Sequence, residues 1–180
     1  MREAVDRIHP PWQCLFWMPL SSFGEVSAVE GMSLRVISDC GEEADLSTLE
    51  RILGSSVVSV FRNRIGQGCQ LHILYKQQVV AGTLFFVFGL TQRFQHIVLT
   101  EQDAVILDAR IDPAFRGQGL YPIFLQLSLD SLKGKNIERV FVVTSEHNEP
   151  SLRALRRIGF RYLMRYKTWM GLYKFDAKPL

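Results

Sequence analysis

Two glycines and the start of a predicted helix lie close together in residues 112–122. Gly117 and Gly119 have no Cβ, so a bulky anion can approach the backbone closely there. The amides of a first helical turn lack partners within the helix, and the helix dipole adds partial positive charge to them. Pro122 cannot donate a hydrogen bond, which restricts the donors to residues 116–121. Together these features predict a phosphate-binding loop.

Other phosphate-binding motifs fit this segment poorly. A dinucleotide-binding fingerprint needs a third glycine at position 122, where this chain has proline. A P-loop needs Gly-Lys-Ser/Thr, which does not occur in the sequence. The remaining alternative is a glycine-rich connection that holds no ligand.

The predicted loop lies within a mixed α/β pattern of elements. Short apolar or alternating runs predict strands, and apolar residues on one helical face predict helices. The expected strands are 33–37, 71–75, 79–88, 104–111, 139–144 and one or two more within 161–175. The expected helices are 47–53, 56–65, 121–132 and 149–158, and residues 89–103 are expected to form a loop or an irregular hairpin. A strand–helix–strand unit therefore surrounds the loop, in a single domain of residues 32–180.

Residues 1–31 are interpreted as an N-terminal extension that packs on the domain or on a partner. The segment contains two Trp and two Phe, which is atypical of a disordered tail. Prolines interrupt its apolar stretch and no small-residue cleavage site follows cleanly, so a secretory signal peptide is not predicted. A homodimer contact through this aromatic segment is a further hypothesis.

Composition argues against several classes of protein. The net charge of +3 is too mild to predict nucleic-acid binding, although it suits a ligand with several phosphates. The longest apolar run, residues 79–90, is too short to span a membrane as a helix. Cys14, Cys40 and Cys69 lie far apart, which indicates reduced thiols in the cytoplasm. Without a Cys-x-x-Cys pair, no metal site is predicted.

The loop resembles motif A of the GNAT acetyltransferase superfamily, commonly written Gln/Arg-x-x-Gly-x-Gly/Ala. Its core is Arg116-Gly117-Gln118-Gly119, and the lead-in residues Ile111 and Pro113 also fit. Ala114 stands where the motif has Gln or Arg, a position that varies in the family.

A second resemblance follows at the spacing that the family requires. Asn148, Ser151, Arg157 and Gly159-Phe160 are similar to motif B. The two motifs, in this order and with a strand between them, make the resemblance specific over residues 33–170. It implies an α/β, GNAT-like fold with a central mixed, twisted sheet of six to seven strands flanked by about four helices.

The resemblance implies acetyl-CoA as a cosubstrate. In the family the loop amides bind the pyrophosphate, the preceding strand pairs with the pantetheine arm, and the residue at Asn148 holds the pantetheine or thioester region. The implied cofactor-binding residues are Ala109, Ile111, Arg116, Gly117, Gln118, Gly119, Leu120, Tyr121, Asn148 and Ser151. Arg153, Arg156, Arg157 and Arg161 form either a solvated basic face or contacts to phosphates or an anionic acceptor.

Acyl transfer to an amine needs removal of a proton from the acceptor ammonium. Asp108 is the first candidate for this base or for an ammonium contact, because it shares a face of a predicted central strand with Arg110. Two charges there are costly unless the face lines a polar cleft. The alternative is a structural Asp108–Arg110 pair. Glu146 is a second candidate, since it follows the next strand, near the point where the central strands of the family separate.

The departing thiolate benefits from a proton donor. The family often uses a tyrosine seven residues after the motif B asparagine, but this chain has Leu155 at that position. Tyr121 is therefore a candidate general acid, with Tyr162 and Tyr166 as other stand-ins.

The expected function is transfer of an acetyl group from acetyl-CoA to a primary amine of a small molecule, such as an amino sugar, an amino acid or a polyamine. The alternatives are transfer of a longer acyl chain, transfer to a protein amine, and a non-catalytic acyl-CoA-binding module, which Leu155 favours.

Overall fold

The computed structural model of the chain describes residues 12–24, 26, 29–39, 43–89, 93–94, 97–169 and 172–176. Eight strands in these residues form one sheet in the order β10-β9-β1-β8-β7-β4-β3-β2, and a short β5-β6 pair stands apart from it. The strands are β1 Gln13–Pro19, β2 Met32–Ile37, β3 Gln70–Lys76, β4 Val79–Phe88, β5 Arg93–Phe94, β6 Ile97–Val98, β7 Asp103–Ile111, β8 Arg139–Ser145, β9 Arg161–Trp169 and β10 Leu172–Asp176. The helices are α2 Glu43–Leu53, α3 Ser55–Gly66, α4 Leu120–Asp130 and α5 Glu149–Ile158, with 3-10 turns at Leu20–Ser22 and Pro113–Phe115.

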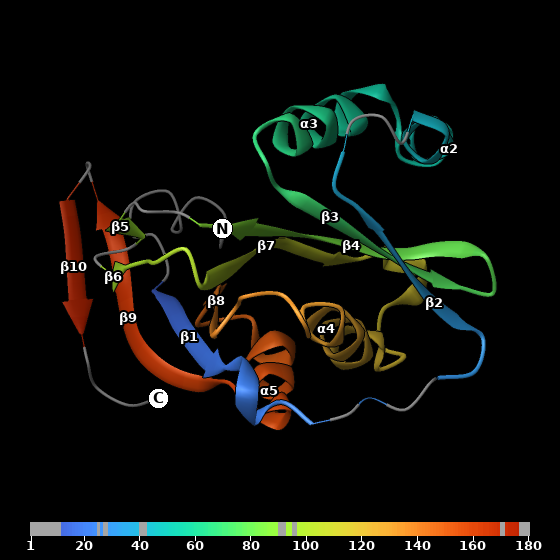
Figure 1. The fold of residues 1–180 in the computed structure, drawn as a ribbon. Helices are drawn as coiled ribbons and strands as arrows, with labels where there is room; N and C mark the ends of the chain where they lie inside the picture. The colour runs from blue at the N-terminus through green and yellow to red at the C-terminus, as the bar shows by residue number, and fades with distance from the viewer. Residues whose placement is uncertain are drawn as a thin grey trace, which may run out of the picture.

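Helices cover both faces of the sheet (Figure 1). On one face, α2 and α3 bury a cluster that includes Phe61 and Phe85. On the opposite face, α4 and α5 bury a larger cluster through Phe124 and Leu155. The sheet is mixed, because β7 and β8 run parallel while its other neighbouring strands are antiparallel. The predicted α/β, GNAT-like fold class is confirmed, with eight strands where six to seven were expected.

The additional strand is β1, which lies inside the sheet between β8 and β9. Its register pairs Gln13 with Ser145 on β8 and with Tyr166 on β9. Residues 14–16 are fully buried, as expected for a strand covered on both faces. The interpretation of residues 1–31 as an extension outside the domain therefore needs correction for this strand. The flanking prolines and the absence of alternation hid it in the sequence.

The remaining elements follow the predicted pattern closely. The helix expected at 47–53 begins earlier, at Glu43. Residues 89–103, expected to form a loop or irregular hairpin, contain the short β5-β6 pair. Gly159 ends α5 in the left-handed region at φ 106°, which is the usual conformation of a helix-terminating glycine.

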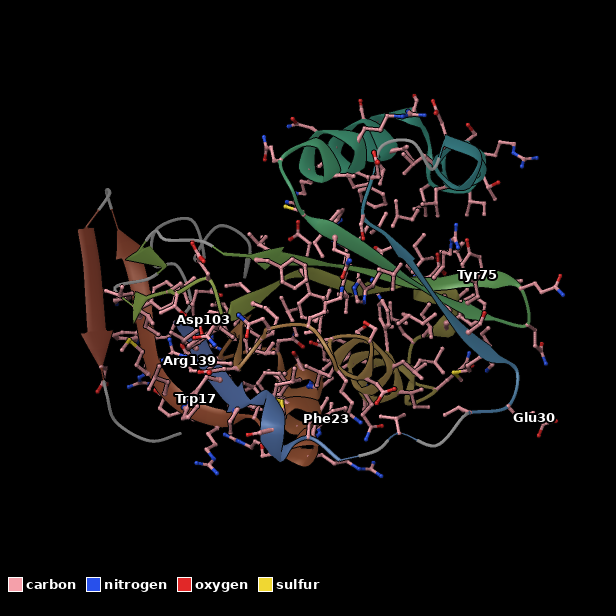
Figure 2. All side chains as sticks on the ribbon, viewed as in Figure 1. Trp17, Phe23, Glu30, Tyr75, Asp103 and Arg139 are labelled. Atoms are coloured by element: carbon pink, nitrogen blue, oxygen red, sulfur yellow. The ribbon has the colours of Figure 1, made fainter. Side chains whose placement is uncertain are left out.

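An ion pair between a buried carboxylate and a half-buried guanidinium joins the start of β7 to the start of β8. Asp103 Oδ1 and Oδ2 each accept a 2.7 Å hydrogen bond from the Arg139 guanidinium. Asp103 Oδ2 also accepts from the backbone amide and the hydroxyl of Thr100, at 2.6 and 3.0 Å. Figure 2 shows Asp103 and Arg139 side by side at this end of the sheet. The two parallel strands are thus held together at their N-terminal ends.

His72 on β3 makes the stability of the fold depend on pH. Its side chain is fully buried, 4.9 Å from Phe86 between ring centroids, and its Nε2 lies 3.1 Å from Gln70 Oε1. Burial, reinforced by the Lys135 ammonium, lowers the pKa of His72 to about 3. In the unfolded chain this pKa returns to about 6.5. Between these values the unfolded state binds more protons, so stability falls as the pH drops below about 6.5.

As the pH drops from about 6.5 to about 5, we expect protonation of His72 in the unfolded state to lower the free energy of unfolding by about 2 kcal/mol. A His72→Leu variant should lose this part of the pH dependence, as measured by urea unfolding at several pH values. Replacement of the exposed His147 by Gln is the control and should retain it. An unchanged pH dependence in His72→Leu would assign the effect to another group.

Candidate active site

The parallel strands β7 and β8 separate after a short paired region. Their pairing extends from Asp103–Arg139 to Ile106–Val142 and no further. Beyond that point β7 still pairs with β4 up to Ile111, and β8 still pairs with β1 up to Ser145. Each strand therefore has an unpaired edge that faces the other across a gap. Such an edge offers backbone donors and acceptors to an extended ligand.

A bulge in β7 accompanies this separation. Leu107 pairs with Phe85 and Arg110 pairs with Thr83, so two β7 residues lie opposite a single β4 residue. Asp108 within the bulge has φ +47°, in the left-handed region that non-glycine residues seldom occupy. Bulges re-aim side chains and often lie beside active sites. Here the bulge lies at the edge of the gap.

The gap opens into a cleft of about 1130 Å³ between the splayed strands, the glycine loop and the start of α5. Most of the sequence-predicted site residues line it. They are Asp108, Ala109, Ile111, Arg116, Gly117, Gly119, Leu120, Tyr121, Asn148 and Ser151. Residues that are distant in the sequence thus meet at one cleft.

The glycine loop presents free backbone donors to the cleft. Gly117 and Gly119 have φ values of 77° and 70°, and a Cβ built on either glycine would meet no protein atom within 4 Å. The amides of residues 117–119 donate no hydrogen bond to any described residue. Gly119 is the N-cap of α4, so the dipole of an 11-residue helix reinforces these donors. The Arg116 side chain folds back onto the end of β7, where its Nε donates a hydrogen bond to Ile111 O at 3.2 Å. This bond stabilises the turn that follows β7.

The N-terminus of α5 forms the opposite wall. Asn148 is its N-cap, and Asn148 Oδ1 accepts from the Ser151 amide at 3.3 Å. This bond leaves the Asn148 side-chain amide group as a donor for a ligand. Arg153 and Arg157 on the same helix also line the cleft, whereas Arg156 and Arg161 do not. The basic helical face predicted from the sequence is therefore divided between cleft and surface.

Tyr121 connects the two walls. Its hydroxyl accepts a hydrogen bond from Ser151 Oγ at 3.4 Å. Burial raises the pKa of Tyr121, and the bond from Ser151 opposes this shift only in part. The phenol therefore stays protonated at neutral pH and can serve as a proton donor within the cleft.

Asp108 pairs with an arginine from α3. Its Oδ2 lies 2.5 Å from Arg64 Nη1, with 42% of the Asp108 side chain exposed. The Arg64 guanidinium also lies 5.0 Å from the centre of the Phe85 ring. The Asp108–Arg110 pair considered from the sequence does not form, because the bulge directs the Asp108 carboxylate to α3 instead. Sequence spacing could not reveal this pair, since 44 positions separate its members in the chain.

A family model with the description acetyltransferase (GNAT) family matches residues 39–160, more than half of the chain. The chain belongs to the GNAT acetyltransferase family. Membership implies an acyltransferase that uses acyl-CoA, as the sequence motifs predicted. The match to this family begins at residue 39, after β1 and β2. It therefore does not include β1, the strand that lies between β8 and β9.

Solved structures share the GNAT fold at low sequence identity. A tandem GNAT protein from the clavulanic acid biosynthesis pathway has a TM-score of 0.64 at 15% identity, over 99% of this chain and 59% of that one. A glucosamine N-acetyltransferase region of a fungal multi-domain β-N-acetylglucosaminidase gives 0.62 at 12%, over 89% and 22%. A GNAT-family acetyltransferase from Colwellia psychrerythraea gives 0.60 at 11%, over 93% and 56%. The chain thus spans less than two thirds of each of these proteins, and no curated protein matches it.

Two predicted residues do not line the cleft of this GNAT protein. Glu146 Oε1 accepts from the Trp12 amide at 3.2 Å, and Glu146 Oε2 lies 3.4 Å from Arg165 Nη1. These bonds tie the carboxylate to the residue before β1 and to β9, which suits a structural role. Gln118 Oε1 accepts from Lys76 Nζ at 2.6 Å, so only the Gln118 backbone is placed to meet a ligand.

Other residues of the GNAT cleft were missed or left open by the sequence. Leu155, at the position of the usual family tyrosine, is fully buried in the core. Gln13 lines the cleft but was not predicted, because β1 was placed outside the domain. Its signal was a short apolar run bounded by prolines, which is consistent with a buried strand.

The two cysteines in the described part of the chain do not line this cleft. Cys14 and Cys69 are free and buried, and Cys40 lies outside the described residues. Burial raises the pKa of the Cys14 thiol to about 11 and also raises that of Cys69. Both therefore stay protonated and unreactive at neutral pH. Separately, within the described residues, no helix is long and apolar enough to cross a membrane.

Proposed function

We propose that this chain transfers an acetyl group from acetyl-CoA to a primary amine of a small molecule, by direct attack of the amine on the thioester. The observation that carries the proposal is one cleft that joins the unpaired edges of β7 and β8 to the loop amides and to Tyr121. An acyl donor with an extended arm suits the unpaired strand edges, and its phosphate groups suit the loop amides.

The residues present fit coenzyme A. The amides of residues 117–119 have no acceptor among the described residues, and the space beside Gly117 and Gly119 is open, as a pyrophosphate site requires. The β7 edge after Ile106 can pair with the two amide groups of a pantetheine arm. Asn148 would hold that arm from α5, and Arg153 and Arg157 would meet the phosphates. When bound here, acetyl-CoA supplies the activated acyl group.

The proposed proton transfers balance the reaction. The C–N bond forms as the C–S bond breaks, and the acceptor nitrogen, initially an ammonium, gives up two protons. Asp108, at the edge of the cleft, contacts the ammonium and passes its protons to solvent. Tyr121 Oη gives one proton to the departing thiolate sulfur and regains one from solvent. The net release is one proton for each amide formed.

Leu155 favours a second candidate, a non-catalytic acyl-CoA-binding module. Its buried side chain removes the usual family acid from the site. In this reading Tyr121 is only a packing and hydrogen-bonding residue. Transfer to a protein amine, transfer of a longer acyl chain, a homodimer and a cytoplasmic location stay predictions of the sequence.

Calorimetry combined with an acceptor panel distinguishes these functions. Titration of coenzyme A and acetyl-CoA into the protein should give dissociation constants in the micromolar range. Incubation with acetyl-CoA and a panel of amino acids, amino sugars and polyamines should release thiol above the rate without acceptor. Binding without transfer to any amine would support the non-catalytic module. Failure to bind either ligand would contradict both functions.

A further inference from the structure

The face of the sheet beneath α3 carries a charged cluster beside the cleft. Phe85 on β4 forms its floor, with the Phe61 ring at 5.2 Å and the Arg64 guanidinium at 5.0 Å from the Phe85 centroid. Phe85 itself is only 1% exposed. Arg64 therefore lies over a dry aromatic surface, where its interactions with anions are less screened than in open water.

The β7 bulge brings a carboxylate to the same cluster. Asp108 lines the cleft and also contacts Arg64, so it lies at the boundary between the proposed donor site and the α3 face. The pair uses Asp108 Oδ2 and Arg64 Nη1. Asp108 Oδ1 has no partner among the described residues, so the carboxylate can accept from a further cation without losing Arg64.

Arg110 adds a second positive charge. Arg110 pairs with Thr83 on β4, two residues before Phe85, so both pairs lie on the α3 face of the sheet. The Arg110 side chain is exposed, lines the cleft, and makes no hydrogen bond or ion pair with any described residue. Arg110 thus adds a second guanidinium on this face without joining the Asp108–Arg64 pair. The cluster has a net charge of +1, counted from Arg64, Arg110 and Asp108.

From this charge arrangement we infer that the acceptor is an amine that also bears a carboxylate, as in an amino acid. The inference rests on the proposed function and specifies its acceptor. Asp108 contacts the ammonium, and Arg110, supported by Arg64, binds the carboxylate through the planar donor pair that guanidinium groups offer. The carboxylate of such an acceptor neutralises the net positive charge of the cluster. A polyamine would leave Arg110 unpaired and add positive charge beside it.

Matched acceptors test this inference. L-Phenylalanine and L-lysine are compared with their carboxamides and with phenethylamine and cadaverine, which lack the carboxylate. Thiol release from acetyl-CoA gives kcat/KM for each acceptor, and calorimetry with protein saturated by coenzyme A gives binding that does not depend on turnover. We expect the carboxylates to be preferred by at least about tenfold, the range for a charged hydrogen-bonded pair.

Variants assign the preference to Arg110. Arg110→Gln should remove the preference while the dissociation constant of coenzyme A stays within about twofold, because Arg110 lies on the α3 face of the sheet and not with the loop amides. Arg62→Gln is the matched control, because Arg62 lies on α3 but pairs with Glu50, and it should keep the preference. Arg110→Lys should restore part of it.

The outcomes separate this inference from the proposed function. Transfer to carboxylate and carboxamide acceptors at equal rates would overturn the inference and leave the amine acetyltransferase intact. Weaker coenzyme A binding in Arg110→Gln, with the acceptor preference retained, would also overturn it and assign Arg110 to the donor site. Carboxylate-selective binding that is lost in Arg110→Gln, without any acetyl transfer, would uphold the carboxylate site and reject the proposed transfer chemistry.

Discussion

A Gly119→Asp variant will bind coenzyme A at least about 100-fold more weakly than the wild-type protein, as expected when several charge-assisted hydrogen bonds to phosphate are lost. Gly119 is the N-cap of α4 and adopts φ 70°. The amides of residues 117–119 are the donors proposed for pyrophosphate. An aspartate carboxylate at position 119 would lie beside these donors and repel the phosphates of the ligand.

The same substitution should leave the fold intact. Aspartate tolerates the left-handed region better than most residues, and a Cβ at Gly119 meets no protein atom within 4 Å. Gly134→Asp is a matched control, since Gly134 has φ +80° and equally open surroundings but lies beyond the end of α4. Calorimetry on both variants, with circular dichroism to check folding, measures the effect. Wild-type affinity in a folded Gly119→Asp variant would place the phosphate site elsewhere.

Replacement of Tyr121 by Phe should lower kcat by about 100-fold, the lower part of the range for general acid–base catalysis. The change removes one hydroxyl from the cleft and breaks its bond with Ser151. Because burial raises the pKa of Tyr121 above its ordinary value of 10.0, the acid form persists through the neutral range. The wild-type rate should therefore fall on this account only above about pH 10, and the variant should lack that alkaline fall.

Tyr162→Phe is the control for this experiment. The Tyr162 hydroxyl is buried without a hydrogen-bond partner among the described residues, and its ring packs on Phe16 at 5.7 Å. Loss of this hydroxyl should leave kcat unchanged. If Tyr121→Phe also kept the full kcat, Tyr121 would be a structural residue and the thiolate would leave without its help. Steady-state rates with background hydrolysis subtracted at each pH decide between these results.

Local chemistry explains what could be predicted for the site. Gly117, Gly119 and Pro122 constrain their own backbone, so the loop and the start of α4 follow from a few adjacent residues. Asn148 caps α5 through an amide three positions away, at Ser151. Ten of the twelve predicted site residues consequently line the cleft, counted as all but Gln118 and Glu146.

Long-range contacts explain why two predicted side chains lie away from the cleft. Glu146 follows β8 as predicted, but its orientation depends on Trp12 and Arg165, from segments that only the folded sheet brings beside it. Gln118 turns to Lys76 on β3 for the same reason. In neither case does the sequence near the residue contain its partner.

By itself, the sequence determined the α/β class, the phosphate-binding loop, the caps of the helices that flank the cleft, and the motifs of the GNAT family. Each depends on backbone preferences or side-chain contacts within a few residues. Only the tertiary structure decided that β1 enters the sheet between β8 and β9 and that β7 and β8 part after Ile106–Val142. It also decided that Asp108 meets Arg64. Strand order and cross-sheet ion pairs arise from packing between distant segments, which no local pattern encodes.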